Sequence, residues 1–479
     1  MLDNAPPGRG TVLMRKGPST MNGNPTIAPN EQLQRDIQSL CGDYARYNSF
    51  DPALYSKYGV KRGLRNADGT GVVAGITQIC NVHGYILNEG ERCPIDGELV
   101  YRGINIRDII SGCQADGRYS WEETAWLLLM GSLPTGAQLV RFTDVLSECR
   151  ALPENFTEDM IMKVASPNIM TMLSRSVLAL SSYDPAPEDT SVENVLRQSV
   201  QLIARMPAIM AASYQVKRRV YDGRSMYLHN PNPEFSTAQN ILRLLRSDKQ
   251  FTDEEARLLD LCLTLHSEHG GGNNSTFAVR LLTSSGTDTY SAISAGIGSL
   301  KGPRHGGASA KVIEQLEYLK ANVYDWEDDG QIRDYLRRAL NREAGDRSGL
   351  IYGMGHAVYT KSDPRCKILK ENALRMAKGT DFEGEFRLLD AVERLAPELL
   401  QEKWGSDRSA CANVDLYSGL VYRMLRIPDE LHTPMFAIAR TAGWCAHRLE
   451  EIGTCNKIIR PAYKPISKPR AYLPIAQRG

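Results

Sequence analysis

Apolar residues recur at every third or fourth position along most of the chain, which is the pattern of amphipathic helices. The first such segment is Glu31–Asn48, where Leu33, Ile37 and Leu40 share one face. Strands and helices do not alternate along the chain, so the sequence predicts an all-α fold rather than a doubly wound sheet. The same periodicity predicts helices over Trp121–Met130, a segment that Pro134 opens, Ser191–Ala212, Asp253–His266, Ala310–Ala321, Asp334–Leu340, Glu385–Leu400, Leu416–Met424 and Phe436–Ile452.

One stretch departs from the helical pattern. Across Gly71–Arg102, residues such as Val73, Ile76 and Ile79 lie among glycines, and Asn88-Glu89-Gly90 has the composition of a turn. Branched apolar residues next to a turn signal are typical of strands. We therefore expect minor β structure near residues 71–102.

The two ends of the chain differ in composition from the rest. Residues 1–30 are rich in proline and glycine, so we expect a flexible N-terminal arm, with Met14 or Met21 as alternative starts. Four prolines follow Arg460. They predict an extended C-terminal segment that can lie across another surface.

Composition excludes several classes of partner. The 57 Lys and Arg residues nearly balance the 56 Asp and Glu residues, so the chain has no global field to attract nucleic acid or an anionic membrane. No apolar run has the roughly 20 residues that a spanning helix needs. The ten cysteines form no CxxC pair, which favours reduced thiols and a cytoplasmic protein over a disulfide framework or zinc site.

Two histidines have unusual surroundings. His305 and His356 are each next to glycine, which lets the backbone approach a ligand closely. His305 also precedes a helical pattern, and the positive end of a helix favours a neutral imidazole that can donate to an oxyanion. We interpret both as functional residues, although a single histidine in a sequence is more often structural.

A third candidate pair allows a metal interpretation. His266 and His269 are three residues apart at the end of a predicted helix, and this spacing occurs in metal sites. The HExxH order is absent and no third ligand has diagnostic spacing. A zinc hydrolase therefore stays a minor alternative. The glycine-rich segments match neither a P-loop nor a dinucleotide fingerprint.

Four motifs in fixed order carry a family resemblance. They are LHSEHGGGNNSTF from Leu265, SLKGPRHGGASAKV from Ser299, GMGHAVYTKSDPR from Gly353, and NVD ending at Asp415. Together with DGELVYRGINIRDI and STAQNILRLL earlier in the chain, they resemble citrate synthase from about Gly71 to Arg460. The resemblance implies condensation of acetyl-CoA with oxaloacetate, with neither metal nor redox cofactor.

The resemblance also implies roles for individual residues. Asp415 would be the base, although an Asp before a predicted helix could equally be an N-cap. His305 would donate to the thioester oxygen and His356 to the ketone oxygen. The carboxylates of the 2-oxo acid would be bound by His269, Arg365, Arg440 and Arg460, with Arg460 serving the partner's site in a homodimer. Guanidinium matches the planar geometry of a carboxylate.

Two positions depart from the family pattern. Thr360 stands where the animal enzymes have a basic residue, so only the neighbouring Lys361 is left as a candidate for binding the coenzyme A phosphates. Arg304 is not the usual neighbour of the histidine at 305.

The resemblance implies a two-domain architecture with the site in a cleft. We expect a large domain from residues 31–306 and 426–479, and a small domain, residues 307–425, that closes over the substrate.

Two alternative functions remain besides the hydrolase. A 2-methylcitrate synthase would use propionyl-CoA, and one methylene changes binding by only about 1–3 kcal/mol. An inactive paralogue would lack some proposed catalytic residues, and this chain has all of them.

Overall fold

A computed structural model describes residues 31–48, 51–66, 69–89, 91–405, 410–454 and 457–477. It confirms the predicted all-α class with minor β structure. The predicted flexible arm, residues 1–30, lies outside the described residues. The elements are α1 (Glu31–Tyr47), α2 (Ala53–Lys57), β1 (Cys80–Asn88), β2 (Glu91–Tyr101), β3 (Ile104–Asn105), α3 (Ile106–Ala115), α4 (Trp121–Met130), α5 (Gly136–Cys149), α6 (Ile169–Ala179), α7 (Val192–Val220), α8 (Thr237–Leu245), α9 (Asp253–His266), α10 (Asn274–Thr283), α11 (Thr289–Leu300), α12 (Ala308–Asn322), α13 (Asp329–Leu340), α14 (Pro364–Ala377), α15 (Glu383–Trp404), α16 (Asp415–Met424) and α17 (His432–Thr454).

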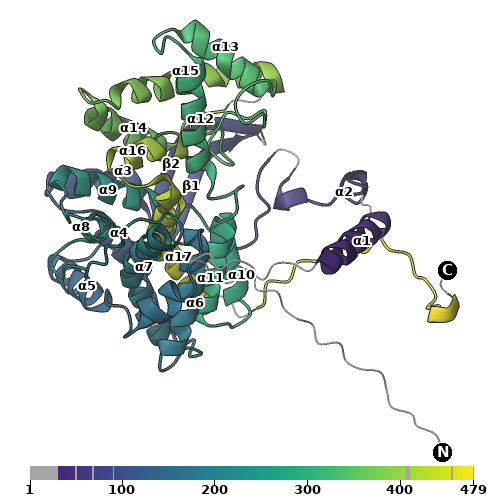
Figure 1. Cartoon of the computed structure of the whole chain (residues 1–479), viewed down its shortest axis with the longest axis horizontal. Helices are drawn as coiled ribbons and strands as arrows, with labels where there is room; N and C mark the ends of the chain where they lie inside the picture. The colour runs from purple at the N-terminus through teal and green to yellow at the C-terminus, as the bar shows by residue number, and fades with distance from the viewer. Residues whose placement is uncertain are drawn as a thin grey trace, which may run out of the picture.

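The helices form two groups (Figure 1). Helices α12 to α16 gather at one end, where α12 packs on α16, α14 on α16 and α13 on α15. The larger group is built around α7 and α17, which pack on each other; α7 also contacts α5, α6 and α8. Contacts of α9 with α14 and α16, and of α12 with α17, join the groups. The chain therefore has its long central helices buried in one body and a smaller layer beside it.

Helix boundaries follow local capping. The predicted ends of α4 and α9 are confirmed, and α4 stops at Gly131, whose φ of 89° suits glycine. The prediction that Pro134 opens the next helix is wrong: α5 begins at Gly136 because Thr135 and Gln138 form a capping box. Helix α7 continues past the predicted end to Val220, since Gln215 and Val216 are still buried.

The β structure is shorter than predicted. Strand β1 begins at Cys80, and Val73 and Ile76 before it are 87% and 88% exposed. The reason is the length of its partner: Cys80 pairs with Tyr101, where β2 ends, so earlier residues have no ladder to join. The β1–β2 hairpin packs tightly on the segment that follows His356. A side chain at Gly97 has no room, since its Cβ would lie 2.1 Å from the carbonyl oxygen of Ser362.

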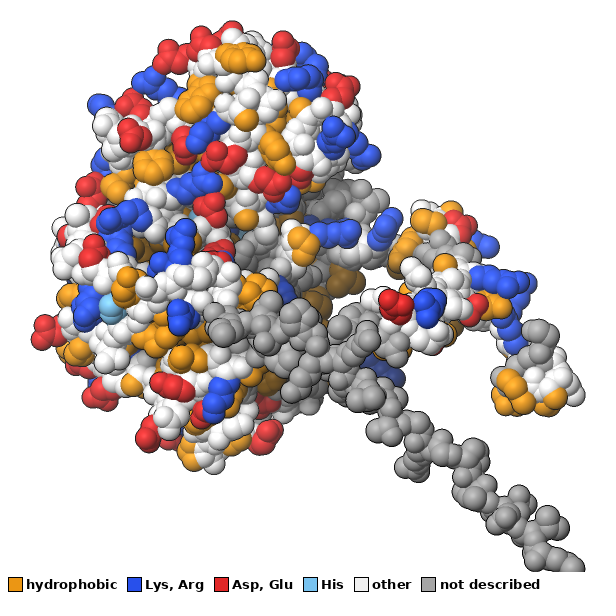
Figure 2. Space-filling model, in the orientation of Figure 1, with side chains coloured by type: hydrophobic (Ala, Val, Ile, Leu, Met, Phe, Trp, Pro, Cys, Tyr) orange, Lys and Arg blue, Asp and Glu red, His pale blue; other side chains and the backbone are white. Residues whose placement is uncertain are grey.

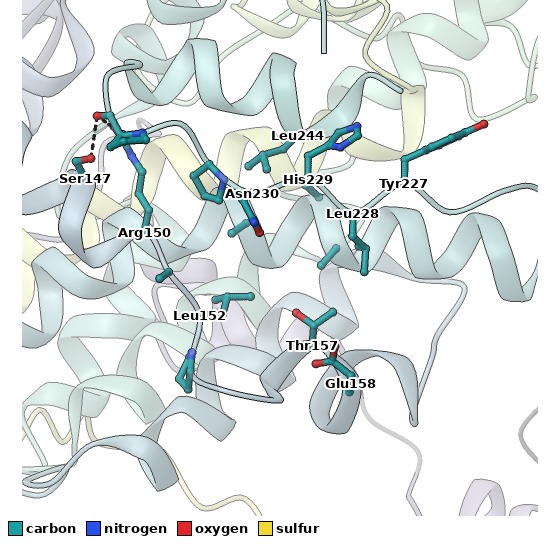
Figure 3. A pocket seen from close by; sticks show the side chains of 17 residues that line it. Ser147, Arg150, Leu152, Thr157, Glu158, Tyr227, Leu228, His229, Asn230 and Leu244 are labelled. Atoms are coloured by element: carbon teal, nitrogen blue, oxygen red, sulfur yellow. Dashed lines mark hydrogen bonds between the residues drawn. The ribbon is translucent and has the colours of Figure 1, made fainter. Parts of the chain in front are cut away.

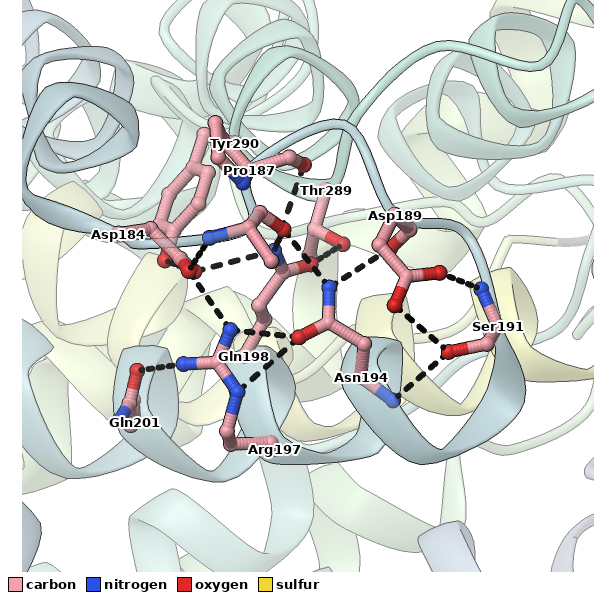
Figure 4. Close-up of polar contacts among 11 residues, drawn as sticks. Asp184, Pro187, Asp189, Ser191, Asn194, Arg197, Gln198, Gln201, Thr289 and Tyr290 are labelled. Atoms are coloured by element: carbon pink, nitrogen blue, oxygen red, sulfur yellow. Dashed lines mark hydrogen bonds and ion pairs between the residues drawn. The ribbon is translucent and has the colours of Figure 1, made fainter.

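A buried polar cluster fixes the loop before α7 (Figure 4). Asp184 accepts hydrogen bonds from the Tyr290 hydroxyl (2.6 Å) and from Arg197 Nη2 (2.7 Å), which joins this loop to α11 and α7. Burial alone would raise the pKa of Asp184, but these bonds and that from the Ala186 amide lower it to about 2. The cluster satisfies its own polar groups, so we interpret it as structural.

Helices α1 and α2 and the described C-terminal segment extend away from the body on the same side (Figure 1). Helix α1 has no buried residue. Residues 461–474 are extended, as the prolines predicted, and Lys464 Nζ lies 5.5 Å from the ring centre of Tyr58. On the face shown in Figure 2, acidic and basic side chains are interspersed. None of the described helices combines the length and apolarity needed to cross a bilayer.

Candidate active site

Two segments distant in sequence pair beside each other and carry His356 and Asp415. Met354 forms a β-bridge with Ala412, and the Gly355 amide donates to the Cys411 carbonyl at 2.7 Å. Gly353 has a φ of 80°, and a Cβ there would lie 2.8 Å from the Leu416 side chain. The glycines next to His356 therefore allow both the turn and the close approach of α16.

Asp415 is the first residue of α16 rather than its N-cap. The Asn413 side chain accepts from the Asp415 amide at 3.0 Å, while the Asp415 carboxylate has no hydrogen-bond partner in the part of the chain that the structure describes. Burial raises the pKa of Asp415 to about 6, although Arg365 opposes the shift. Near neutral pH this group is a carboxylate with a basicity suited to proton abstraction.

His356 is fixed as one tautomer by the backbone. Its Nδ1 accepts from the amides of Val358 and Tyr359, both at 3.0 Å. Burial, followed by the charge of Arg365, lowers the pKa of His356 to about 4. A neutral ring whose Nδ1 is an acceptor carries its hydrogen on Nε2. His356 can therefore donate a hydrogen bond from Nε2.

His305 lies just before α12 and contacts Ser275. Its Nε2 is 3.0 Å from the Ser275 hydroxyl, which also accepts from Trp444 Nε1 at 3.2 Å. Burial, followed by Arg440, lowers the pKa of His305 to about 4. We predicted a neutral His305 because it precedes a helix. Burial, rather than the helix end, is the main cause of its lowered pKa. Gly306 is required here, because a Cβ would lie 2.2 Å from the Leu300 carbonyl.

Arg440 and His269 present unpaired polar atoms in the interior. Arg440 is 0% exposed; its Nε donates to the His266 carbonyl at 2.8 Å, but both terminal nitrogens lack a hydrogen-bond partner among the described residues. The Nε2 of His269 is also buried and unpaired there. The His269 ring packs edge-on to His356, with centroids 4.9 Å apart. An unpaired buried guanidinium is costly unless a ligand completes it.

Arg365 differs from Arg440 in already having a carboxylate partner. Asp363 accepts from its Nε at 3.1 Å and from its Nη2 at 2.8 Å, and both side chains are buried. Asp363 also caps α14 by accepting from the Arg365 amide. The predicted binding residue is therefore held in place by a residue that the sequence analysis did not identify, although Asp before Pro is a recognisable cap signal.

Two predicted residues lie apart from this cluster. Arg460 is exposed and follows Ile459, whose amide donates to the Ser284 hydroxyl at 3.0 Å. Lys361 has a side chain that is 61% exposed and lies 3.6 Å from the Asp96 carboxylate. Asp96 also accepts from Lys367 at 3.1 Å. Besides burial, the charge of Arg365 acts to lower the pKa values of His269, His356 and Asp415, and that of Arg440 acts to lower those of His269 and His305, so these predicted residues lie close together within one chain.

Within the described residues, His266 and His269 are not joined by the further ligands that the metal alternative requires. His266 Nδ1 donates to the Cys262 carbonyl at 2.7 Å, and its ring packs on Phe436. Among residues 31–477 that the structure describes, three or more His, Cys, Asp or Glu side chains do not converge as metal ligands.

A buried chain of hydrogen bonds from Arg280 through His447 to Glu268 supports the loop that carries His269. Arg280 Nε donates to His447 Nδ1 at 3.0 Å, so His447 Nε2 bears the hydrogen and donates to the Glu268 carboxylate at 3.0 Å. Burial would raise the pKa of Glu268, but His447 and Arg440 lower it to about 2. Sequence reasoning missed these residues, because their pairing joins α10, α17 and the loop only in three dimensions.

A cavity of about 630 Å³ lies elsewhere, between α5, α7 and the loop before α8 (Figure 3). The Nη1 of the buried Arg150 in this cavity donates hydrogen bonds to the carbonyls of Asn232 and Pro233, and the Ser147 hydroxyl also donates to the Pro233 carbonyl. None of the predicted catalytic or binding residues lines this cavity. We therefore place the candidate active site at His269, His305 and His356 with Asp415, Arg365 and Arg440, which we call the histidine cluster.

The chain is similar to known proteins over most of its length. A family model described as citrate synthase, C-terminal domain, matches residues 66–462. The citrate synthase of Acidithiobacillus ferridurans is 36% identical over 417 residues, covering 85% of this chain and 97% of that protein. The 2-methylcitrate synthase of Shewanella oneidensis is 31% identical over 382 residues, covering 79% and 92%.

Solved structures are similar in fold. The ternary complex of carboxymethyl coenzyme A and oxaloacetate with citrate synthase from Thermoplasma acidophilum has a TM-score of 0.72 and 25% identity, covering 88% of this chain and 99% of that chain. Citrate synthase from Pyrobaculum aerophilum has a TM-score of 0.69 and 28% identity, covering 85% and 94%.

Proposed function

Because the chain belongs to the citrate synthase family, we propose that it condenses acetyl-CoA with oxaloacetate and water to give citrate and coenzyme A, without a metal or redox cofactor. The observation that carries the proposal is the unpaired guanidinium of Arg440, buried next to the histidine cluster. A dicarboxylic 2-oxo acid supplies the carboxylate that this group lacks. Its ketone oxygen is matched by the Nε2 donor of His356.

The proposed chemistry has three steps. Asp415 takes a proton from the acetyl methyl group while His305 donates a hydrogen bond to the thioester oxygen, which stabilises the enol. The enol carbon then bonds to the ketone carbon of oxaloacetate, and His356 gives its Nε2 proton to the new alkoxide. Water finally cleaves the citryl thioester and releases coenzyme A as the thiol.

The same proposal includes closure of a small domain. We assign residues 307–425 to this domain and residues 31–306 and 426–479 to the large one. His356, Arg365 and Asp415 would then move with the small domain, and His269, His305 and Arg440 with the large domain. Closure over oxaloacetate would complete the acetyl-CoA site and exclude water from the thioester.

The alternative substrate is propionyl-CoA, since one relative is a 2-methylcitrate synthase. The test is release of coenzyme A from acetyl-CoA and from propionyl-CoA, each with and without oxaloacetate. We expect release that requires oxaloacetate and a higher kcat/KM for acetyl-CoA. A higher kcat/KM for propionyl-CoA would assign the chain to the alternative reaction, and no release from either would reject both.

Replacing His305 and replacing His356 are expected to impair different steps of the reaction. His305→Ala should spare oxaloacetate binding and abolish enolisation, because His305 contacts only the thioester in the proposed mechanism. His356→Ala should weaken oxaloacetate binding and also stop condensation. Solvent-proton exchange into an unreactive acyl-CoA analogue, together with oxaloacetate titration, separates the two. Identical behaviour of both variants in both assays would contradict the division of labour.

We further propose a homodimer in which Arg460 completes the partner's site. Arg460 is exposed and directly precedes the extended segment of residues 461–474, so it can reach across a two-fold interface. Arg460→Ala and Asp415→Ala proteins, each nearly inactive, should regain activity when subunits exchange, because one site of the heterodimer then has both residues. Mixing Asp415→Ala with His356→Ala is the control, since both residues belong to one chain and no intact site can form. Heterodimers of the first pair without activity would exclude sharing.

A further inference from the structure

Tyr359 lies against His356 and His269 in the candidate site, and no step proposed above uses it. Its ring is stacked on His356, with centroids 4.6 Å apart and an interplanar angle of 25°. It also meets His269 edge-on at 5.7 Å. Tyr359 is almost fully buried. One face of the His356 imidazole is therefore covered by an aromatic ring rather than by water.

The backbone of the same residue holds His356 at a second point. The Tyr359 amide is one of the two donors to His356 Nδ1. Stacking restricts the plane of the imidazole, and the hydrogen bond restricts its rotation within that plane. Tyr359 thus acts on both the orientation and the tautomer of His356.

The Tyr359 side chain is in turn held by the β1–β2 hairpin. Its hydroxyl donates to the Glu98 carbonyl at 3.1 Å. The ring fits between two glycines: a Cβ at Gly84 would lie 3.1 Å from Tyr359 Cδ1, and one at Gly97 would lie 2.6 Å from it. Burial raises the pKa of Tyr359, so the hydroxyl stays protonated as the donor.

Tyr359 also contacts the segment that leads to Asp415. The Cys411 thiol donates to the Tyr359 carbonyl at 3.7 Å, and Cys411 accepts from the Gly355 amide in the paired segments described above. A single residue thereby joins the hairpin, the His356 loop and the segment before α16.

We propose that Tyr359 is a positioning residue, which fixes the His356 imidazole with its Nε2 donor toward the ketone and shields that ring from water. The proposal rests on the function proposed for His356. It adds the β1–β2 hairpin to the active-site machinery, because the glycines of the hairpin receive the ring. Misplacing a reacting group by about 1 Å can cost on the order of 10²-fold in rate.

The test compares Tyr359→Leu, which removes the ring, with Tyr359→Phe, which keeps the ring and loses only the hydroxyl. In enzyme labelled with ¹⁵N-histidine, the His356 signals are assigned by comparison with His356→Gln. We expect His356 in the native protein and in Tyr359→Phe to stay neutral over the range from about pH 5 to 8. In Tyr359→Leu, water reaches the ring, and its pKa should move toward the ordinary value of about 6.5.

Kinetics provide the second readout. Tyr359→Leu should lower kcat by about 10- to 100-fold with a smaller change in KM for acetyl-CoA. Tyr359→Phe should stay within about fivefold of the native rate, the effect of one net hydrogen bond of about 1 kcal/mol. Tyr359→Met, which has an unbranched side chain without a ring, replaces the Leu variant if that protein does not fold, as judged by its thermal unfolding.

Two results would overturn the proposal. One is a His356 that remains neutral across this pH range in the folded Leu or Met variant with kcat unchanged. The other is equal damage by Phe and Leu, since stacking would then have no role. The NMR comparison does not depend on turnover. A native enzyme that releases coenzyme A from neither acyl-CoA would reject the proposed function, while the histidine titration would still decide the role of Tyr359.

Discussion

Replacing Asp415 by Asn is expected to lower kcat by about 10²- to 10⁴-fold while oxaloacetate affinity changes little. The amide retains the size of the side chain and cannot accept the methyl proton. The carboxylate has no hydrogen-bond partner in the described structure, so its loss should break no structural contact. Turnover and oxaloacetate titration of the same preparation separate the two effects.

The pH dependence gives an independent check on this assignment. The pKa of Asp415 is raised by burial to about 6, and only the ionised form is a base. The rate should therefore fall as pH decreases through about 6, rather than near the ordinary Asp value of about 3.9. The pKa values of His305 and His356, both lowered to about 4, are too low to account for a loss of rate near pH 6.

A matched control is Asp334→Asn in α13, whose side chain is 77% exposed. It removes the same charge from the same group of helices without touching the site, and it should leave kcat unchanged. Near-normal turnover of Asp415→Asn, or an equal loss in Asp334→Asn, would contradict the proposed role of Asp415.

The periodic pattern predicted the helices where local signals agree with tertiary packing. Helix α9 is an example: Thr252 and Glu255 form a capping box, the apolar residues continue to His266, and the predicted bounds are confirmed. The prediction was less accurate where packing overrides the local pattern. Residues 71–79 have strand composition, but β2 is too short to pair with them. Several helices, including α6, α10 and α11, were not predicted because small and polar residues interrupt their apolar pattern.

The candidate site shows a similar division. Motifs identified His305, His356 and Asp415, but the tautomer of His356 depends on the amides of Val358 and Tyr359, which no motif encodes. Likewise the resemblance gave Arg365 and Arg440 the same role in binding carboxylates. In the structure Arg365 already has a carboxylate partner, Asp363, whereas the terminal nitrogens of Arg440 have no hydrogen-bond partner among the described residues. Such differences arise from contacts between α9, α14 and α17, so they become visible only when the fold is known.

The difference between two buried arginines of α17 leads to the last prediction. Arg440 and Arg448 are both 0% exposed. Arg448 donates to the Thr289 hydroxyl (3.1 Å), the Thr283 hydroxyl (3.1 Å) and the Thr287 carbonyl (2.8 Å). Arg440 makes one hydrogen bond, through Nε, and its guanidinium lies over the Phe436 ring at 4.7 Å, while its terminal nitrogens have no hydrogen-bond partner within the described chain. One guanidinium is completed by the fold, and the other is left for a ligand.

Replacing each by Met should therefore change stability and binding in opposite ways. Arg440→Met removes a buried charge that makes a single hydrogen bond, and it also removes the attraction between Arg440 and the buried Glu268 carboxylate. These effects oppose each other, so the free energy of unfolding of the ligand-free protein should change by no more than about 1 kcal/mol. Oxaloacetate affinity should fall by about 2–5 kcal/mol, which is roughly 30-fold to several thousand-fold in Kd. Arg448→Met should lower the free energy of unfolding by about 2 kcal/mol or more, because it removes three hydrogen bonds to threonine oxygens in the interior, and it should leave Kd unchanged. Denaturant unfolding without ligand and calorimetric titration with oxaloacetate measure both quantities for each variant. If Arg440→Met loses as much stability as Arg448→Met and still binds oxaloacetate normally, Arg440 is a structural residue and the proposed carboxylate site is wrong.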